Sequence, residues 1–353
     1  MAPCAAFGYL SLIVSVFTVG LAFASTTYDV AVIGGGPAGL SAVSSLSRVR
    51  RNVIMFDSGE YRNDDYEPLH DIIGSDGIMP AELRDKAQKE IKKYDTAAMK
   101  NATVKSVISA TSKGELSNNV TSFTIKDDKN ETYTARKIVL ATGVTDVLPE
   151  VVMKIIRSDI YWCPWCSGYE SKDLPIGILG DFSDIVGSVL EIETLNTDII
   201  ALVNGTETEQ QESILRKKYP DWERMLGKYN VEVNNATITN ITVDPSSNSS
   251  DPVRTFTVEF DKGDPIVRKS FIYNYPMKPI SDLPQNIKGL KMDQHGKIIT
   301  NMTHGMRTSL PGVFAVGDAN NDGTTNVPHA MWSAKRAAVA IHIELQLEDS
   351  LSA

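Results

Sequence analysis

Cysteine is scarce in this sequence, with three residues in 353, at positions 4, 163 and 166. So few thiols exclude a small fold that is held together by several disulfides. An excess of positive charge is also missing, because 35 Lys and Arg stand against 44 Asp and Glu. A protein that follows the phosphates of a nucleic acid needs a basic face, so the composition argues against a nucleic-acid partner.

Long apolar runs are confined to the N-terminus, and a mean hydropathy of -0.14 excludes a protein with many membrane spans. Charge is absent before Asp29, and residues 5–24 are almost wholly apolar. The sequence Ala-Phe-Ala at 22–24 predicts a signal peptide over residues 1–24 and a mature start at Ser25, after which no membrane attachment is expected. A membrane anchor is the alternative, because the n-region lacks Lys or Arg and the run approaches spanning length.

Eight Asn-x-Ser/Thr sequons follow, more than the Asn, Ser and Thr content gives by chance. Together with the signal peptide they predict a secreted, N-glycosylated protein. The alternative is a surface that is simply rich in Asn and Thr. The sequons begin at Asn101, Asn119, Asn130, Asn204, Asn235, Asn240, Asn248 and Asn301.

A glycine-rich turn stands between a predicted strand, Tyr28–Ile33, and a predicted helix over 40–46. Strand, turn and helix in this order predict a dinucleotide-binding unit, and a chain of this length usually divides into two domains. The alternative is a glycine-rich turn without a ligand. The turn consists of Gly34, Gly35, Gly36, Pro37, Ala38 and Gly39.

The glycines of this turn have separate roles in that interpretation. Gly34 permits the tight turn, Gly36 lets a pyrophosphate approach the backbone, and Gly39 lets the helix and the strand pack closely. The phosphates then bind at the helix N-terminus, where free N–H groups favour an anion. A second strand over 52–56 ends at Asp57, which is placed to accept hydrogen bonds from a ribose hydroxyl.

Two later strands, over 138–143 and 312–318, are expected to end at the same crevice. The residues at their ends are Ala141, Thr142, Gly143, Gly317 and Asp318. Asp318 is a candidate ligand for the ribityl chain of a flavin, and the helix predicted from Val327 to Leu345 points its N-terminus at the flavin ring.

The chain resembles the low-molecular-weight thioredoxin-reductase-like flavoproteins. The matching segments, in the order and spacing of that family, are GGGPAG at 34–39, ATG at 141–143, CPWC at 163–166 and TSLPGVFAVGDA at 308–319. Two more segments, DSGEYRN at 57–63 and NVPHAMWSAKRAA at 326–338, look closer to a fungal branch of gliotoxin-type dithiol oxidases and secreted sulfhydryl oxidases. The signal peptide and the sequons favour the secreted sulfhydryl oxidases.

The resemblance implies FAD as the cofactor, an α/β fold of two Rossmann-like three-layer domains, and a homodimer. Residues 25–147 and 276–353 then form the FAD-binding domain, which is interrupted by a smaller inserted domain over 148–275 that corresponds to an NADPH-binding module. The alternative to FAD contacts from residues near 62–70 is that they form a polar loop that binds no ligand. The positions that match those around FAD are Asp57, Arg62, Asn63, His70, Ala141, Asp318, Asn326 and Val327.

The nicotinamide site of the inserted domain looks incomplete. A strand at 176–179 leads into a turn where Gly180 takes the first glycine position, but Phe182 takes the second and Ile185 the third. The phenyl ring is expected to block the pyrophosphate. The next strand, 198–203, ends in Asn-Gly-Thr-Glu, without the Arg or Lys that pairs with a 2′-phosphate. NADPH is therefore not expected to be the reductant unless another surface binds it.

Cys163 and Cys166 form a CxxC pair, the only cysteines left once the signal peptide is removed. Pro164 suits the first position of a helix, so the Cys163 sulfur is expected at a helix N-terminus, where the thiolate is favoured. A two-residue spacer is typical of a redox-active pair. A static disulfide or half of a zinc site is the alternative, but zinc needs four ligands and the histidines show no suitable spacing, so no metal is expected.

These parts predict a thiol oxidase. A substrate thiolate attacks the disulfide at Cys163, a second thiol resolves the mixed disulfide, and Cys166, the flavin-facing sulfur by resemblance, passes two electrons to FAD. Without a nicotinamide site, O2 takes the electrons, so two small thiols such as glutathione and O2 become a disulfide and H2O2. Proton transfer is assigned to His329, with Glu170 second, because Ser167 stands where relatives have Asp or His. A purely structural histidine is the alternative.

Three other functions stay open: oxidation of one secondary-metabolite dithiol, NADPH-dependent disulfide reduction, and a redox-sensing flavoprotein without turnover. A comparison of linear thiols with epidithiol precursors tests the first, and NADPH consumption without added thiol tests the second. The third predicts a bound flavin that O2 reoxidises slowly. No motif in the substrate-facing loops ranks the thiols.

Overall fold

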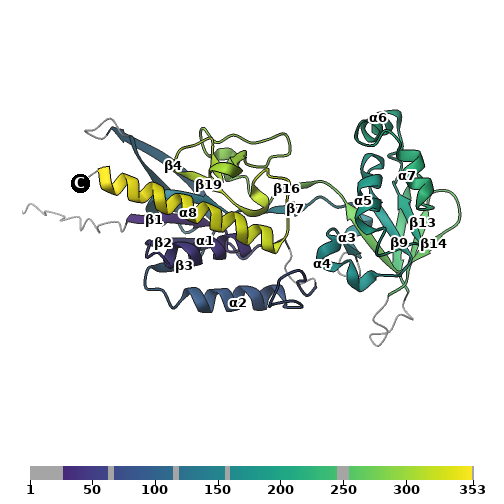
Figure 1. Cartoon of the computed structure of the whole chain (residues 1–353), viewed down its shortest axis with the longest axis horizontal. Coiled ribbons are helices and arrows are strands. Elements are labelled where there is room, and N and C mark those ends of the chain that lie inside the picture. Colours follow the sequence, from purple (N-terminus) through teal and green to yellow (C-terminus); the bar gives the residue numbers. More distant parts are fainter. Residues whose placement is uncertain (1–26, 63–66, 114–118, 156–159, 245–253, 352–353) are drawn as a thin grey trace, which may run out of the picture.

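The fold comes from a computed structural model that describes residues 27–62, 67–113, 119–155, 160–244 and 254–351. Both ends of the described chain form one domain, the host domain, and the middle of the chain forms a second, the inserted domain (Figure 1). The predicted signal peptide over 1–24 and the predicted FAD contact Asn63 lie outside the described residues.

The host domain is built around a nine-stranded sheet. Its elements are β1 (Thr27–Ile33), α1 (Pro37–Ser47), β2 (Val53–Asp57), α2 (Pro80–Ile91), β3 (Ala97–Asn101), β4 (Val104–Lys113), β5 (Asn119–Asp127), β6 (Thr132–Leu140), β17 (Thr300–Asn301), β18 (Arg307–Thr308), β19 (Val313–Ala315) and α8 (Val327–Leu351), with short 3-10 helices η3 (Pro284–Asn286), η4 (Met302–His304) and η5 (Gly317–Ala319). The strand order is β17-β18-β19-β6-β1-β2-β3, and β4 and β5 extend from β6. Because β2, β1, β6 and β19 are parallel, their carboxyl ends meet at one edge of the sheet.

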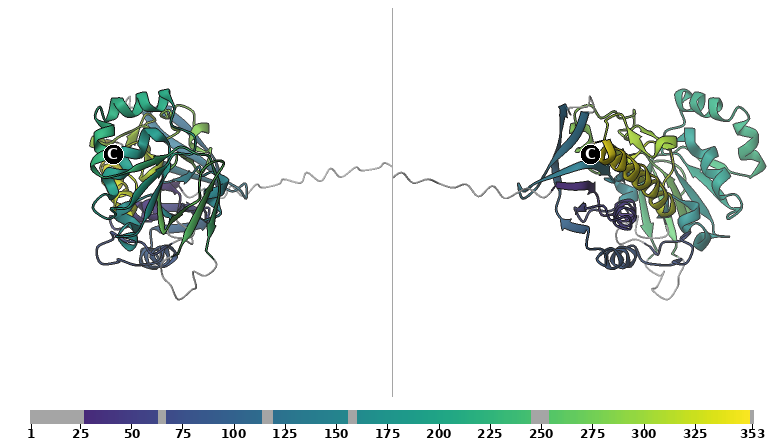
Figure 2. Two further views of the ribbon diagram at one scale, coloured as in Figure 1. Left: turned by 90° about the vertical axis from the view of Figure 1, so that its right-hand side faces the viewer. Right: turned by 60° about the vertical axis from the view of Figure 1, so that its left-hand side comes forward.

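Helices α1 and α8 pack against each other on one face of this sheet (Figure 2). Their contact is close because α8 presents small side chains: Ala334 and Ala337 are fully buried in the same apolar cluster as Ala42 and Val43 of α1. The opposite face is covered by β4, β5 and the segment around Leu283. The sheet is therefore buried on both faces, which explains why β1 reads as an almost continuous apolar run.

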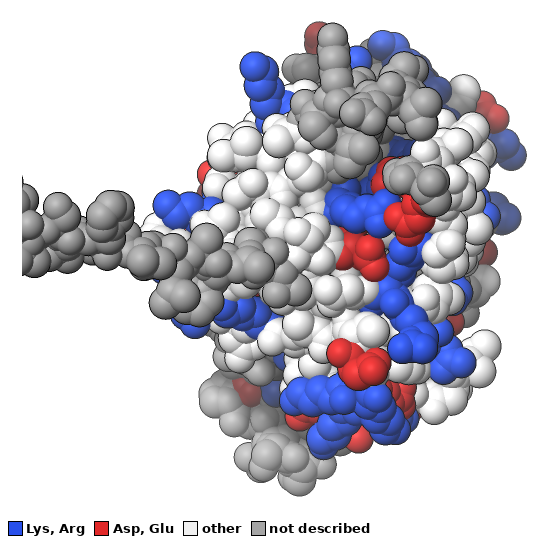
Figure 3. Space-filling model, turned by 90° about the vertical axis from the view of Figure 1, so that its left-hand side faces the viewer, with Lys and Arg blue, Asp and Glu red and all other residues white. Residues whose placement is uncertain are grey.

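The last helix continues to Leu351, past its predicted end at Leu345. Carboxylates in its final turns pair with cations at the edge of β1, β2 and β6, and Figure 3 shows positive and negative side chains alternating on this side of the molecule. These contacts hold the final turns on the sheet. The pairs are Lys137–Glu344, Lys137–Glu348, Arg136–Asp349 and Arg51–Asp349.

The inserted domain has its own five-stranded parallel sheet. Its elements are α3 (Glu150–Met153), β8 (Ile160–Tyr161), α4 (Pro164–Ser167), η1 (Tyr169–Ser171), β9 (Ile176–Gly180), η2 (Phe182–Asp184), α5 (Ile185–Ile192), β10 (Ile199–Leu202), α6 (Glu209–Lys218), α7 (Trp222–Lys228), β11 (Glu232–Asn234), β12 (Ile238–Val243), β13 (Phe256–Phe260), β14 (Ile266–Arg268) and β15 (Ser270–Asn274). The order is β11-β10-β9-β15-β8. Helices α5 to α7 cover one face, and the antiparallel strands β12 to β14 cover the other. The predicted α/β class with two Rossmann-like three-layer domains is confirmed.

Two short strands, β7 (Val144–Asp146) and β16 (Met277–Pro279), connect the domains. They pair antiparallel, with Asp146 opposite Met277, so the chain enters and leaves the inserted domain at one place. The predicted limits 148–275 run from just after β7 to just before β16. Within the described residues, no helix is long and apolar enough to cross a membrane, and no group of three His, Cys, Asp or Glu side chains is placed to hold a metal ion.

Candidate redox site

The glycine-rich turn between β1 and α1 has a conformation that only glycine fits. Gly34 has a φ of +119°, and a Cβ there would lie 2.1 Å from the carbonyl oxygen of Ala141. A Cβ on Gly39 would lie 1.8 Å from the carbonyl oxygen of Gly34. Gly36, by contrast, has no other heavy atom within 4 Å of its Cβ direction, so the space beside it is open. This is the arrangement that a bound pyrophosphate requires.

A cavity of about 570 Å³ lies between this turn and the inserted domain. Strand ends of the host sheet, the hinge strand β7 and the CxxC segment all line it, so distant parts of the sequence meet there. Gly39, Asp57 and His329 are not among its lining residues. The predicted residues that line it are Gly34, Gly35, Gly36, Pro37, Ala38, Arg62, His70, Ala141, Thr142, Gly143, Cys163, Cys166, Gly317, Asp318, Asn326 and Val327.

The cavity fits a dinucleotide such as FAD. Its volume lies in the range of ligand sites, about 300–1,000 Å³. Helix α1 begins at Pro37, and Gly36 before it provides no side-chain cap, so the first free N–H groups of the helix are left for an anion. Among the described residues, the hydroxyl of Thr142 is buried without a hydrogen-bond partner at the cavity wall. Such a group is expected to find its partner in a ligand.

Asp57 does not face the cavity, contrary to the expectation that it binds a ribose hydroxyl. It is 7% exposed, and its Oδ1 accepts the backbone N–H of Gly59 at 3.0 Å. Its Oδ2 accepts the hydroxyl of Tyr61 at 2.6 Å. A Cβ on Gly35 would lie 2.0 Å from the same oxygen, so the carboxylate is pressed against the turn. Asp57 therefore fixes the turn and Tyr61, and Tyr61 lines the cavity in its place.

Arg62 lines the cavity, but its guanidinium binds the protein's own oxygens rather than a phosphate. Nε and Nη2 donate to the two carboxylate oxygens of Asp146 at 3.2 and 2.7 Å. Nη1 donates to Asp318 at 3.0 Å and to the Thr325 hydroxyl at 2.9 Å. Burial works against the charge, but the hydrogen bond to Asp146 and the two carboxylate charges outweigh it and raise the pKa of Arg62. Arg62 therefore lies at the cavity, as the resemblance implies, with all three of its guanidinium nitrogens hydrogen-bonded to side chains of the protein itself.

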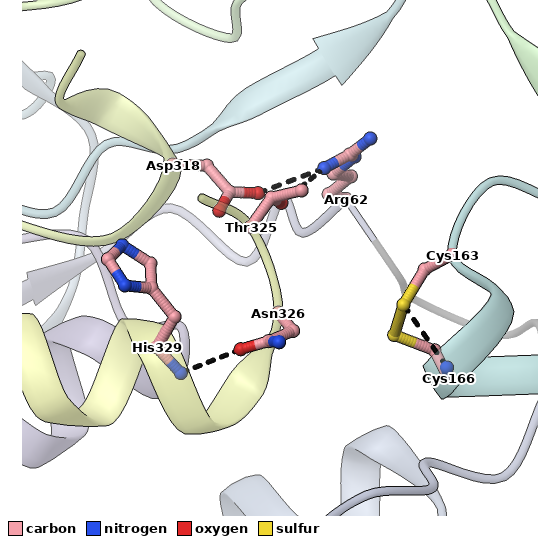
Figure 4. The surroundings of a disulfide bond; sticks show 7 residues. All are labelled: Arg62, Cys163, Cys166, Asp318, Thr325, Asn326 and His329. Carbon is pink, nitrogen blue, oxygen red and sulfur yellow. Dashed lines mark hydrogen bonds and ion pairs between the residues drawn. A yellow bond between two sulfur atoms is a disulfide. The ribbon is translucent and has the colours of Figure 1, made fainter. Parts of the chain in front are cut away.

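Cys163 and Cys166 form a disulfide at the end of β8 (Figure 4). Cys163 precedes Pro164, the first residue of α4, and its Sγ accepts the backbone N–H of Cys166 at 3.1 Å. The Cys163 sulfur therefore sits at a helix N-terminus, as predicted, where an N–H donor stabilises a thiolate. Cys163 is 7% exposed and Cys166 is half-buried.

His329 is not directed at the disulfide. Its Nε2 lies 3.1 Å from Asp322 Oδ2, its backbone N–H donates to Asn326 Oδ1, and its ring points away from the cysteines (Figure 4). Burial opposes the charge of Asp322, but hydrogen bonds from His329 and Thr324 outweigh it and lower the pKa of Asp322. The assignment of His329 as the proton-transfer residue is corrected: the helix start is right, but the ring faces the loop before the helix.

The other acid–base candidate, Glu170, contacts a second predicted residue. Glu170 lies in η1 just after α4, and its Oε1 is 3.5 Å from Nε2 of His70. Nδ1 of His70 lies 3.2 Å from Asp76 Oδ2. His70 thus joins a loop of the host domain to the turn that follows the disulfide. Sequence alone gave no signal for this pair, because the two residues lie in different domains.

The turn of the inserted domain that starts at Gly180 lacks an anion site. The expected reason is that the Phe182 ring blocks the pyrophosphate, but the structure shows another. The ring of Phe182 does not block the turn: it is 1% exposed and packs edge-on against Trp222 in the domain core. Its backbone N–H, which would face a phosphate, donates to the hydroxyl of Thr206 at 3.0 Å. Asp181 and Asp184 add two carboxylates to the turn, and burial together with the Asp184 charge raises the pKa of Asp181.

Over residues 28–159 and 209–334 the sequence matches the family described as pyridine nucleotide-disulphide oxidoreductase. The chain belongs to this family. FAD is therefore its cofactor, and the turn at Gly34–Gly39 with the open space beside Gly36 is the part of this chain that would hold the pyrophosphate.

This pyridine nucleotide-disulphide oxidoreductase is of the thioredoxin-reductase-like kind and has fungal relatives. It is 45% identical over 332 residues to a probable thioredoxin reductase of Arthroderma benhamiae, covering 91% of this chain and 81% of the relative. It is 28% identical to thioredoxin reductase tcpT of Claviceps purpurea, over 88% of this chain and 91% of the other. The crystal structure of HlmI superposes with a TM-score of 0.78 at 28% identity, covering 92% of this chain and 95% of that one.

Proposed function

We propose that this protein is a flavin-dependent thiol oxidase that converts two small thiols and O2 into a disulfide and H2O2. The observation that supports this most is a contrast within one chain. The disulfide lines the same cavity as the glycine-rich turn at 34–39, whereas the second nucleotide-binding turn has no free N–H at Phe182 and carries two carboxylates. This contrast favours electron entry through the cysteines over entry from a nicotinamide. Glutathione and cysteine are the thiols we propose.

The cysteines carry out the thiol chemistry in this proposal. A substrate thiolate attacks the Cys163 sulfur, the Cys163–Cys166 bond breaks, and Cys166 leaves as a thiolate. A second substrate thiolate attacks the substrate sulfur of the mixed disulfide, so the substrate disulfide departs and both cysteines are reduced. FAD, when bound beside the disulfide, would supply the two-electron oxidant needed to restore the Cys163–Cys166 bond, with O2 as the final electron acceptor. The N–H of Cys166 that reaches Cys163 Sγ would stabilise the Cys163 thiolate in the reduced protein, before the disulfide is restored.

The proposal assigns proton transfer to the His70–Glu170 pair and not to His329. A substrate thiol must lose a proton before it attacks, and a histidine is suited to accept one near neutral pH. His70 lines the same cavity as Cys163 and Cys166, and its Nε2 faces Glu170. His70→Gln is expected to slow thiol-dependent turnover, whereas His329→Gln is expected to leave the rate unchanged.

The deciding experiment follows O2 uptake and H2O2 formation by the purified protein with glutathione, cysteine and dithiothreitol, each with and without NADPH. We expect peroxide with thiol alone and no change on adding NADPH. Cys163→Ser and Cys166→Ser are each expected to abolish turnover while flavin absorbance per chain is unchanged. Thiol-dependent peroxide in either variant would refute the scheme.

A second candidate is an NADPH-dependent disulfide reductase. The names of the relatives favour it, because those of Arthroderma benhamiae and Claviceps purpurea are called thioredoxin reductases. It predicts NADPH consumption with a disulfide substrate and no added thiol. A third candidate is oxidation of one secondary-metabolite dithiol, which predicts that an epidithiol precursor is oxidised far faster than glutathione.

We also propose that the protein is secreted, N-glycosylated and a homodimer. Residues 1–24 and the eight sequons support the first two, and the resemblance to dimeric flavoproteins supports the third. N-terminal sequencing of protein from the culture medium should begin at Ser25. Treatment with an endoglycosidase should lower the apparent mass, and sedimentation of the deglycosylated protein should give twice the mass of one chain.

A further inference from the structure

Arg62 occupies a junction of three separate parts of the molecule. It lies in the loop after β2, and its side chain is 10% exposed. Its two ion pairs reach Asp146, the last residue of the hinge strand β7, and Asp318, in η5 at the edge of the cavity. Asp146 also accepts the hydroxyl of Tyr273 from β15 of the inserted domain, at 3.2 Å. One guanidinium therefore contacts the host domain and the hinge directly, and the inserted sheet through Asp146.

The flat face of the same guanidinium lies against Trp162. The Arg62 Cζ is 3.9 Å from the centre of the Trp162 ring, which is a cation–π contact. Trp162 directly precedes Cys163, so the residue before the redox disulfide is fixed by a residue of the other domain. Trp162 and both cysteines line the cavity next to Arg62.

We propose that Arg62 is a positioning residue: it fixes the disulfide-bearing segment against the flavin cavity by joining Asp146, Asp318 and the Trp162 ring. The inference rests on the family's exchange of electrons between flavin and disulfide and holds whether or not O2 is the acceptor. Arginine is needed because its planar fork binds a carboxylate through two nitrogens while its flat face stacks on an aromatic ring, and a lysine ammonium cannot make both contacts at once.

The test is Arg62→Lys in the full-length holoenzyme, with Arg51→Lys as the matched control. Arg51 is also a buried arginine between two carboxylates, Asp29 and Asp349, but it lies outside the cavity. Hydrogen–deuterium exchange of the peptide spanning 160–168 should become faster in Arg62→Lys only. Anaerobic flavin reduction by dithiothreitol should slow by about 10- to 100-fold, the effect of a misplacement near 1 Å, with flavin content per chain unchanged.

A pair of Trp162 variants separates the stacking contact from the ion pairs. Trp162→Phe keeps an aromatic face for the guanidinium and should stay within about threefold of the wild-type reduction rate, whereas Trp162→Leu should resemble Arg62→Lys. Unchanged exchange at 160–168 together with loss of flavin from Arg62→Lys would overturn the proposal and show that Arg62 retains the cofactor. Equal reduction rates in Trp162→Leu and wild type would overturn it as well.

Discussion

The chain contains two strand–turn–helix units of the same topology, β1–α1 in the host domain and β9–α5 in the inserted domain. In the first, Gly34 has a φ of +119°, and Gly39 lies so close to the Gly34 carbonyl that no Cβ fits between them. The space beside Gly36, at the start of the helix, is open. In the second, Gly180 is outside the positive-φ region, and Ile185 replaces the third glycine with a side chain that is 1% exposed. The difference teaches that a few positions decide whether this unit binds a phosphate or only fills a core.

The largest expected effect comes from the same substitution at the first glycine of each turn. Gly34→Ala forces a Cβ to 2.1 Å from the Ala141 carbonyl at a positive φ, so it should cost roughly 3 kcal/mol of stability and release the flavin. Gly180→Ala meets the carbonyl of Asn274 at 3.3 Å and should cost about 1 kcal/mol with flavin retained. Urea unfolding and flavin absorbance of both variants measure this, and equal losses would remove the contrast between the turns.

The second glycine position sharpens the comparison by separating binding from stability. Gly36 has an extended backbone, and its Cβ direction is open, so Gly36→Val should leave the fold intact and weaken FAD binding by about 100-fold or more. At the equivalent position, Phe182→Leu should lower the free energy of unfolding by about 1 to 2 kcal/mol and leave FAD affinity unchanged. Reconstitution of the apoprotein with FAD and urea unfolding report the two quantities. Tight FAD binding by Gly36→Val would contradict the assigned phosphate position.

The smallest expected effect concerns the charge of the second turn. Burial and the neighbouring Asp184 raise the pKa of Asp181, so the folded state disfavours its carboxylate. The resulting loss of stability is present above the raised pKa and disappears as the pH falls and the group takes up a proton. Asp181→Asn should therefore stabilise the protein at pH 7 by less than about 1 kcal/mol, and the gain should vanish near the usual carboxyl pKa of about 3.9. A gain that is constant with pH would point to packing instead.

Much of the site could be predicted from the sequence because its parts are strand ends. Three of its parts directly follow parallel strands: the turn at 34–39, residues 141–143 and Asp318. The sheet brings these strand ends together independently of the conformation of the loops. The CxxC motif is local, so its helix start at Pro164 and the N–H contact to Cys163 also follow from adjacent residues.

The directions of side chains could not be predicted in the same way. His329 stands at the expected start of α8, but which side of the helix faces the cavity depends on how the helix is rotated, and Asp322 binds the ring. The spacing from Gly180 predicts that Phe182 stands in the turn, but its ring packs into the core against Trp222, which no local pattern indicates. The partners of Arg62 lie in β7 and η5, far from it in the sequence, so no local sequence pattern predicts these ion pairs.

The hinge of two paired strands has a consequence for how the domains are joined. Because Asp146 stands opposite Met277, the two ends of the host chain are neighbours in one antiparallel ladder, about 5 Å apart. In topological terms the inserted domain replaces the tip of a β-hairpin. A two-residue turn such as Asn-Gly suffices to close that hairpin, so the host domain is separable in principle as a continuous chain that keeps every strand of its own sheet.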